Sequence, residues 1–116
     1  MNFESYKIPQ GNIMIAFSDE NLSVGTLELN PTQELTKHNR PCLESLFQLE
    51  GTCTMKLFED NGEITNVTLN KGDSINIPKE KFHIHSNQSD KKSITLWKAS
   101  GDIRTIIDNI RKSNNM

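Results

Sequence analysis

The sequence HNRPCLESLFQLEG, at residues 38–51, combines histidine, arginine and glutamate with an apolar run that ends at a glycine. In an extended strand, alternate side chains point to the same face. If this strand is regular, one of its faces carries His38, Arg40, Cys42, Glu44, Leu46 and Gln48. Burying polar groups in a β protein costs free energy unless they have partners. This row therefore indicates a metal, an internal ion pair or a ligand.

Short strand-like runs separated by turn signals extend on both sides of this stretch. We expect strands at 3–8, 12–17, 22–29, 35–38, 43–50, 53–59, 63–69, 73–78, 82–87 and 92–99. Asn61-Gly62 lies between two of these runs, and this dipeptide is the strongest short signal for a β-hairpin. Strands at intervals of roughly 8–12 residues are typical of an all-β sandwich or barrel. The sequence therefore predicts an all-β domain.

The end of the chain changes to helical periodicity. Spacings of i, i+3, i+4 and i+7 place on one helix face Ile103, Ile106, Ile107 and Ile110. Asp102 is a suitable N-cap, and basic residues follow near the C-terminal end, where the helix dipole favours cations. We predict a short helix at about 102–112 that packs on the outside of the β-barrel. The alternative is that this helix contacts a second subunit.

The length and composition fit one small globular domain, 1–116, with its own hydrophobic core. The net charge of -2 and the scattered charges argue against a nucleic-acid-binding surface. No apolar run approaches the roughly 20 residues of a membrane span, and the first residues lack a secretory signal pattern. The two cysteines form no CxxC motif. We expect a cytoplasmic protein that binds neither nucleic acid nor membrane.

Two spaced motifs can be recognised once the strands are placed. The first covers 32–51 and contains His38-x-Arg40-x3-Glu44-x6-Gly51. The second covers 72–87 and contains Gly72-x5-Pro78-x4-His83-x3-Asn87. They resemble the two motifs of the cupin superfamily, G-x5-H-x-H-x3-4-E-x6-G and G-x5-P-x-G-x2-H-x3-N, in the right order and separation. The resemblance implies an antiparallel double-stranded β-helix, or jelly-roll barrel, with a short C-terminal helix.

The sequence departs from the cupin pattern at three positions. Thr32 and Glu80 stand where the pattern has glycines, and at these turns the loss of glycine is tolerable if the backbone keeps a negative φ. Arg40 stands where the first motif has its second histidine. Arg40 cannot be a metal ligand, because a guanidinium has only donors and stays protonated.

The resemblance to cupins implies a divalent metal in the mouth of the barrel, held there by three histidines and a glutamate. Residue by residue, this role passes to His38, Glu44 and His83. Two imidazoles and a carboxylate form the facial triad that holds Fe(II) with open positions, and Mn, Ni or Zn would also fit. Arg40 would then lie beside the open positions and bind a carboxylate or phosphate of the substrate. In the alternative, Arg40 pairs with Glu44 and no metal binds.

His85 follows His83 by two residues, on the same strand face, where the family usually has an apolar residue. It is a candidate additional ligand or a catalytic base, because an imidazole has a pKa near neutrality. The alternative is a core histidine that is hydrogen-bonded to Gln48 or another inward polar group. Cys42 is interpreted as a small buried residue, with a metal ligand or a reactive thiol as the alternatives.

Strands that are free at the rim of a small barrel tend to be covered by pairing, and small cupins are commonly homodimers. Residues 12–17 have apolar side chains on both faces, which fits a dimer interface or a strand enclosed within one subunit. The fold leaves the reaction open. We predict a small metal-dependent enzyme for a small anionic metabolite, in which Arg40 binds the anion and His85 moves protons. The alternative is a non-catalytic, metal-free cupin that binds a small molecule.

Overall fold

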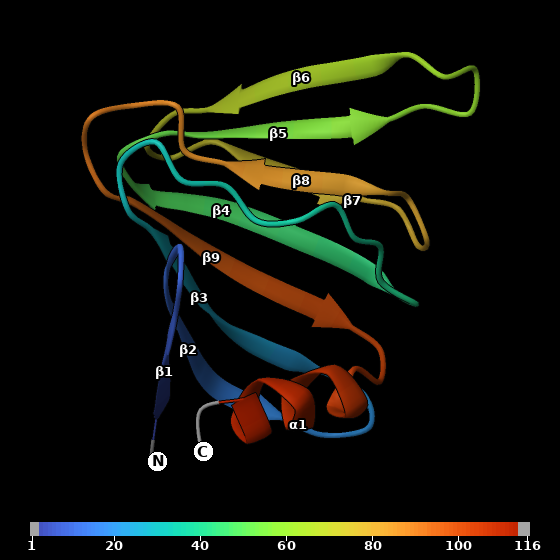
Figure 1. Ribbon diagram of the computed structural model, residues 1–116. Coiled ribbons are helices and arrows are strands. Elements are labelled where there is room, and N and C mark those ends of the chain that lie inside the picture. The colour runs from blue at the N-terminus through green and yellow to red at the C-terminus, as the bar shows by residue number, and fades with distance from the viewer. Residues whose placement is uncertain (1–2, 114–116) are drawn as a thin grey trace.

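Two antiparallel sheets form the body of the protein, and the computed structural model describes residues 3–113. The elements are β1 (Glu4–Ile8), β2 (Gly11–Ser18), β3 (Ser23–Leu29), β4 (Leu43–Glu50), β5 (Cys53–Phe58), β6 (Ile64–Leu69), β7 (Ser74–Ile77), β8 (His83–Ser86), β9 (Ser93–Ser100) and α1 (Arg104–Ser113). The larger sheet has the order β1-β2-β3-β9-β4-β7, and the smaller has β6-β5-β8 (Figure 1). This arrangement confirms the predicted all-β architecture with a C-terminal helix.

The predicted hairpin at Asn61-Gly62 is present. Strands β5 and β6 pair along their whole length, and Gly62 has a φ of 87° at the turn. The predicted strand at 35–38 is wrong. The segment between β3 and β4 runs beside β8 (Figure 1) but joins it only through two isolated bridges, at Glu34 and His38. The regular row of alternating side chains therefore begins only at β4, and His38 is held in place by its single bridge.

The condition of a negative φ at the two substituted turns is not met. Thr32 has a φ of 64° and Glu80 has a φ of 65°, both in the left-handed region that glycine normally occupies. Backbone hydrogen bonds hold both turns: the Thr32 amide donates to the Ser89 carbonyl at 3.2 Å, and the Glu80 amide donates to the Arg40 carbonyl at 2.7 Å. The turns thus keep a glycine-like conformation without glycine, at a cost of about 1–2 kcal/mol each.

Buried apolar side chains fill the space between the two sheets. This core consists of Leu46, Cys53, Met55, Leu57, Leu69 and Ile77. It contains the inward positions of β4 and β5, as expected from the alternation of side chains along a strand. The core lies beneath one part of the larger sheet and leaves the rest of that face to another element.

Helix α1 covers the remaining part of the inner face of the larger sheet. Its Ile107 is buried and belongs to a cluster that includes Ile15 of β2 and Ala99 of β9. Ala99 pairs directly with Glu44, so the helix lies on the same face of the sheet as that glutamate. The predicted packing on its own subunit is confirmed, and so is the cap, because Asp102 Oδ1 accepts from the Arg104 amide at 3.1 Å. The predicted position on the outside of the barrel is wrong.

Candidate metal centre

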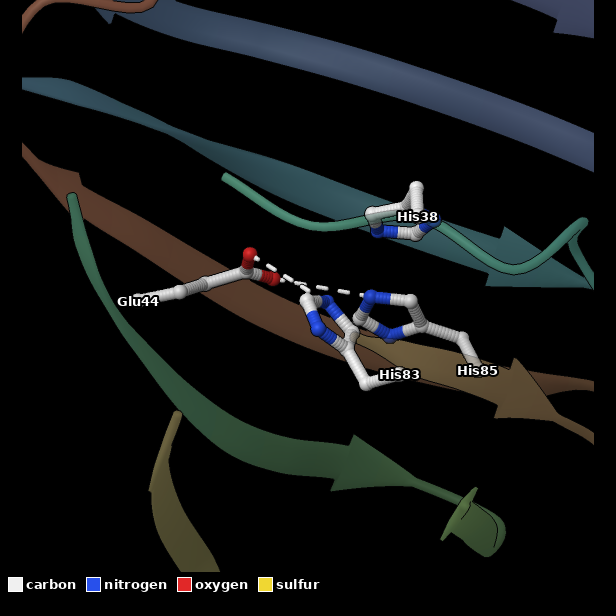
Figure 2. A group of neighbouring side chains, drawn as sticks. All are labelled: His38, Glu44, His83 and His85. Carbon is white, nitrogen blue, oxygen red and sulfur yellow. Dashed lines mark ion pairs between the residues drawn. The ribbon is translucent and has the colours of Figure 1, made fainter. Parts of the chain in front are cut away.

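All three histidines of the sequence meet Glu44 between the two sheets (Figure 2). Glu44 is on β4, His83 and His85 are on β8, and His38 is on the segment that joins β3 to β4. One potential ligand atom from each side chain lies within 4.8 Å of the others. The structure therefore brings together the three residues that the motifs predict as ligands, and it adds His85 to them.

Local backbone structure explains this convergence. His83 and His85 are two residues apart on β8, so their side chains point to the same face. His38 joins them through the isolated bridge to His83, in which the backbone hydrogen bonds measure 3.0 and 2.8 Å. Glu44 reaches the cluster from β4, between its neighbours on β7 and β9. Regular strand pairing thus fixes Glu44, His83 and His85, and an isolated bridge fixes His38.

Backbone carbonyl groups orient two of the imidazole rings. His38 Nδ1 lies 3.0 Å from the Thr36 carbonyl, and His83 Nδ1 lies 2.8 Å from the Lys81 carbonyl. A ring that donates its Nδ1 proton to a carbonyl keeps an unprotonated Nε2, and histidine ligands of metals are commonly held in this way. The two carbonyl groups therefore favour the tautomer in which Nε2 can bind a metal.

Two ring nitrogens of the cluster are buried without a hydrogen-bond partner among residues 3–113. They are His83 Nε2 and His85 Nδ1. An unpaired buried polar atom costs about 1–3 kcal/mol, so such atoms need an explanation. A divalent cation would supply the missing partner for His83 Nε2, which also lies 3.6 Å from Glu44 Oε2. The residues present thus fit a metal ion.

The electrostatic state of the cluster also suits a cation. Burial is the main cause that lowers the pKa of His85 to about 3 and the pKa of His38 to about 4. Burial alone would raise the pKa of Glu44, but the contact with His83 and the charge of His85 outweigh it and lower this pKa to about 2. At neutral pH the rings of His38 and His85 are therefore neutral and Glu44 is a carboxylate, which is the protonation state in which these groups bind metals. The 3.5 Å contact between Glu44 Oε1 and His85 Nε2 is then not an ion pair.

Arg40 lines the same pocket as His38, Glu44 and His85. Within the described residues, the only hydrogen bond of its guanidinium is the one that Nη1 donates to the Asn39 carbonyl at 3.3 Å. No ion pair connects Arg40 to Glu44 in this part of the chain, where the carboxylate contacts His83 and His85 instead. The metal-free Arg40–Glu44 pair is therefore not formed. Arg40 is a partly buried cation with donors available to a ligand.

The two other polar positions of this stretch belong to the packing. Gln48 is fully buried, but its amide donates to Ser93 Oγ at 2.9 Å and accepts from Thr95 Oγ1 at 2.6 Å. The hydrogen bond that we considered between Gln48 and His85 is therefore absent from the described structure. Cys42 is 5 % exposed and packs in the cluster beneath α1, where burial raises the pKa of its thiol. This agrees with the interpretation of Cys42 as a small buried residue.

A pocket of about 510 Å³, part of which is open solvent, adjoins the cluster. Its polar lining consists of His38, Arg40, Glu44 and His85. Its apolar lining consists of Ile13, Leu27, Leu35, Trp97, Ala99 and the four isoleucines Ile103, Ile106, Ile107 and Ile110. The sequence did not indicate that α1 lines the pocket. Helical periodicity shows which face of the helix is apolar, but it gives no information about what that face covers.

Comparison with known proteins places this two-sheet barrel in the cupin fold. No protein-family model and no curated protein matches the sequence. The structure is similar to solved structures, and the examples in the next paragraph have the cupin fold. The protein therefore has the fold that its two motifs predict.

Three solved structures illustrate this similarity. Oxalate decarboxylase from Bacillus subtilis has a TM-score of 0.77 and 20% identity, with 85% of this chain and 28% of that chain covered. The capsular polysaccharide assembling protein CapF from Staphylococcus aureus has a TM-score of 0.76 and 14% identity over 86% and 31%. Oxalate oxidase in complex with the substrate analogue glycolate has a TM-score of 0.66 and 13% identity over 70% and 42%. The matched region thus spans less than half of each of these proteins, and the similarity concerns the fold.

Proposed function

We propose that this cupin is a small metal-dependent enzyme that acts on a small anionic metabolite. The observation that carries the proposal is the cluster itself, in which three imidazoles and one carboxylate offer ligand atoms within 4.8 Å of one another. Metal–ligand bonds of about 2 Å place the ligand atoms of one ion at most about 4 Å apart. Small side-chain rotations therefore suffice for one ion to contact all four residues.

His38, Glu44 and His83 hold the metal in this proposal, and His85 is a fourth ligand. A general base works best when its pKa lies near the working pH. The lowered pKa of His85, about 3, is far from neutrality, so metal binding suits this residue better than proton transfer. A bound Fe, Mn, Ni or Zn ion would supply a Lewis acid or, for a redox metal, an O₂-binding centre.

Arg40 binds the anionic group of the substrate in this proposal. Its guanidinium lines the pocket beside the ligands and has donors that no described protein group occupies. A planar guanidinium can hold a carboxylate through two parallel hydrogen bonds, which fixes the orientation of the bound molecule. Oxalate and glycolate, which appear in the names of the structural neighbours, are small carboxylates of this kind. They support the class of ligand, whereas the reaction stays undefined.

The test is metal binding by protein that is purified without a histidine tag. We expect elemental analysis to find a divalent metal, and the metal-free protein to bind Mn(II), Fe(II) or Ni(II) with a 1:1 stoichiometry. His83→Ala should weaken this binding at least about 100-fold, whereas Lys79→Ala, an exposed control, should not change it. Absence of metal, together with dissociation constants weaker than about millimolar, would contradict the proposal. It would favour the metal-free alternative, in which Arg40, His83 and His85 bind an anion.

We also propose that the protein is a cytoplasmic homodimer. Phe47 is 42% exposed and pairs with Leu96, and the same row continues through Thr26 to Met14 on the outer face of the larger sheet. Phe47 is exposed and Leu96 and Met14 are half-buried, and contiguous apolar side chains at a surface often mark interfaces. Ile15 of β2 packs against α1 on the inner face of the sheet. The predicted interface at residues 12–17 is therefore supported only for the outer face of this strand, which carries Met14. Sedimentation equilibrium should give a mass twice that of one chain. The Phe47→Asp substitution should reduce the measured mass to that of a single chain.

No helix among the described residues is long and apolar enough to cross a bilayer.

A further inference from the structure

We infer that the substrate is a small carboxylate with a short alkyl group, and that helix α1 forms the wall that selects this alkyl group. This inference rests on the proposed function of the same site and adds the substrate class to it. It depends on the fact that Arg40 and the isoleucines of α1 line a single pocket.

The polar and apolar walls of this pocket come from different elements. The polar side chains belong to β4, β8 and the segment before β4, whereas most of the apolar ones belong to β2, β3, β9 and α1. A molecule whose carboxylate contacts Arg40 and the metal ligands therefore extends along isoleucine, leucine and tryptophan side chains. Each carbon that is buried against such a surface contributes about 0.8 kcal/mol to binding.

The same walls disfavour a second anionic group. Arg40 is the only lysine or arginine among the residues that line the pocket. A second carboxylate at the far end of the bound molecule, beyond Arg40 and the metal ligands, would lie against Ile106, Ile110 or Leu35, where it would lose its hydration without gaining a cationic partner from these residues. The chemistry of the pocket thus favours a monocarboxylate with an alkyl group over an acid that has a second carboxylate at its far end.

Helix α1 is suited to be a fixed wall. An isolated helix of 10 residues is unstable in water, so tertiary contacts must hold α1 in place. Ile107 is 1% exposed at its centre, and near its end Arg111 donates to both carboxylate oxygens of Glu4, at 2.8 and 2.7 Å. A wall that is ordered before the ligand arrives lowers the entropic cost of binding.

Tryptophan fluorescence offers a direct test, because Trp97 is the only tryptophan of the chain and lines the pocket. The Zn(II)-loaded protein is titrated with pyruvate, with 4-methyl-2-oxopentanoate, and with 2-oxopentanedioate, which has a second carboxylate at its far end. The second acid has three more carbon atoms than pyruvate. We expect it to bind about 50-fold more tightly than pyruvate, or about fourfold for each buried carbon, and more tightly than 2-oxopentanedioate.

Variants of α1 show whether the helix is responsible. Ile106→Asn should reduce the advantage of the longer acid over pyruvate at least fivefold, and Ile106→Leu should retain it. Thr105→Ala changes an exposed residue of the same helix and should leave both affinities unaltered. Circular dichroism of each variant controls for loss of the helix. An advantage that survives in a folded Ile106→Asn protein would overturn the role of α1.

The outcomes separate this inference from the proposed function. Equal affinities for pyruvate and 4-methyl-2-oxopentanoate, or tighter binding of 2-oxopentanedioate, would overturn the inference while leaving Zn(II) binding as support for the metal site. Failure to bind Zn(II) would overturn the proposed function. The same titrations on metal-free protein then decide the inference: a preference for the longer acid supports it, whereas no preference or no binding overturns it.

Discussion

Arg40 and His85 together define how this site differs from the cupin pattern. The arginine removes one imidazole from the first motif, and His85 brings an imidazole to the same cluster from β8. The cluster therefore regains three imidazoles, and a cation is placed beside them. This exchange suggests a metal site in which the arginine has changed from a ligand position to an anion-binding position.

The two residues should consequently have opposite effects on metal affinity. His85→Ala removes a proposed ligand and should weaken Mn(II) binding at least about 100-fold, since even outer partners of metal ligands contribute 10–100-fold. Arg40→Gln removes a nearby positive charge and should strengthen it several-fold. Isothermal titration of the metal-free proteins measures both values. Equal weakening by the two substitutions would contradict this division of roles.

The lowered pKa of His85 makes the stability of the metal-free protein depend on pH. The unfolded chain has an ordinary imidazole with a pKa near 6.5, whereas the pKa of folded His85 is about 3, mainly because of burial. Between these two pH values the unfolded state binds more protons than the folded state. The contribution of His85 to the free energy of unfolding is therefore complete above pH 6.5 and decreases as the pH falls. The loss is roughly 1.4 kcal/mol per pH unit. Urea unfolding at pH 7.5 and 5.0 should show it, and His85→Asn should reduce the slope. An unchanged slope would contradict the pKa assignment.

The left-handed turn at Glu80 predicts a stabilising substitution. Glu80→Gly should raise the free energy of unfolding by about 1 kcal/mol, because glycine adopts a φ of 65° without steric cost. Lys79→Gly is the matched control, and it should lower stability by up to about 1 kcal/mol through the greater entropy of the unfolded chain. Urea unfolding of both variants measures the difference. A destabilising effect at both positions would show that the strain at Glu80 is relieved in some other way.

At the scale of elements, α1 completes the inner face of the larger sheet and forms part of the pocket. Ile107 lies at the centre of this contact, against Ile15 and Ala99. Ile107→Ala should lower the free energy of unfolding by about 2–5 kcal/mol, the usual cost of truncating a buried isoleucine. Thr105→Ala, on the exposed side of the helix, should change it by less than about 0.5 kcal/mol. Equal effects in thermal or urea unfolding would mean that the helix is not packed as described.

Sequence periodicity accounts for many of the elements but not for where α1 lies. Alternation along β4 and β8 places Glu44, His83 and His85 on inner faces, and the spacing of the motifs identifies His38. The position of α1 depends on which part of the larger sheet the smaller sheet leaves uncovered, and this is a tertiary property. The left-handed turns at Thr32 and Glu80 are held by backbone hydrogen bonds to distant residues, and the residue types themselves give no signal for them; the glycines of the cupin pattern at these positions are the only indication.

At the scale of the whole molecule, the two sheets hold the candidate ligands in a fixed arrangement. Glu44 belongs to the larger sheet and the histidines at 83 and 85 to the smaller, so the cluster lies where the two sheets face each other. Solved structures with only 13–20% identity share this fold, which shows that the architecture tolerates extensive sequence change. The chemistry therefore depends on the few side chains that point into the barrel.

Crystals soaked in Zn(II) test most directly whether these side chains form one metal centre. The account predicts a single strong anomalous peak inside the barrel, about 2.1 Å from Nε2 of His38 and His83 and within bonding distance of Glu44 and His85. Zn(II) bound only to surface residues of the same crystals, with no peak among these four side chains, would contradict it.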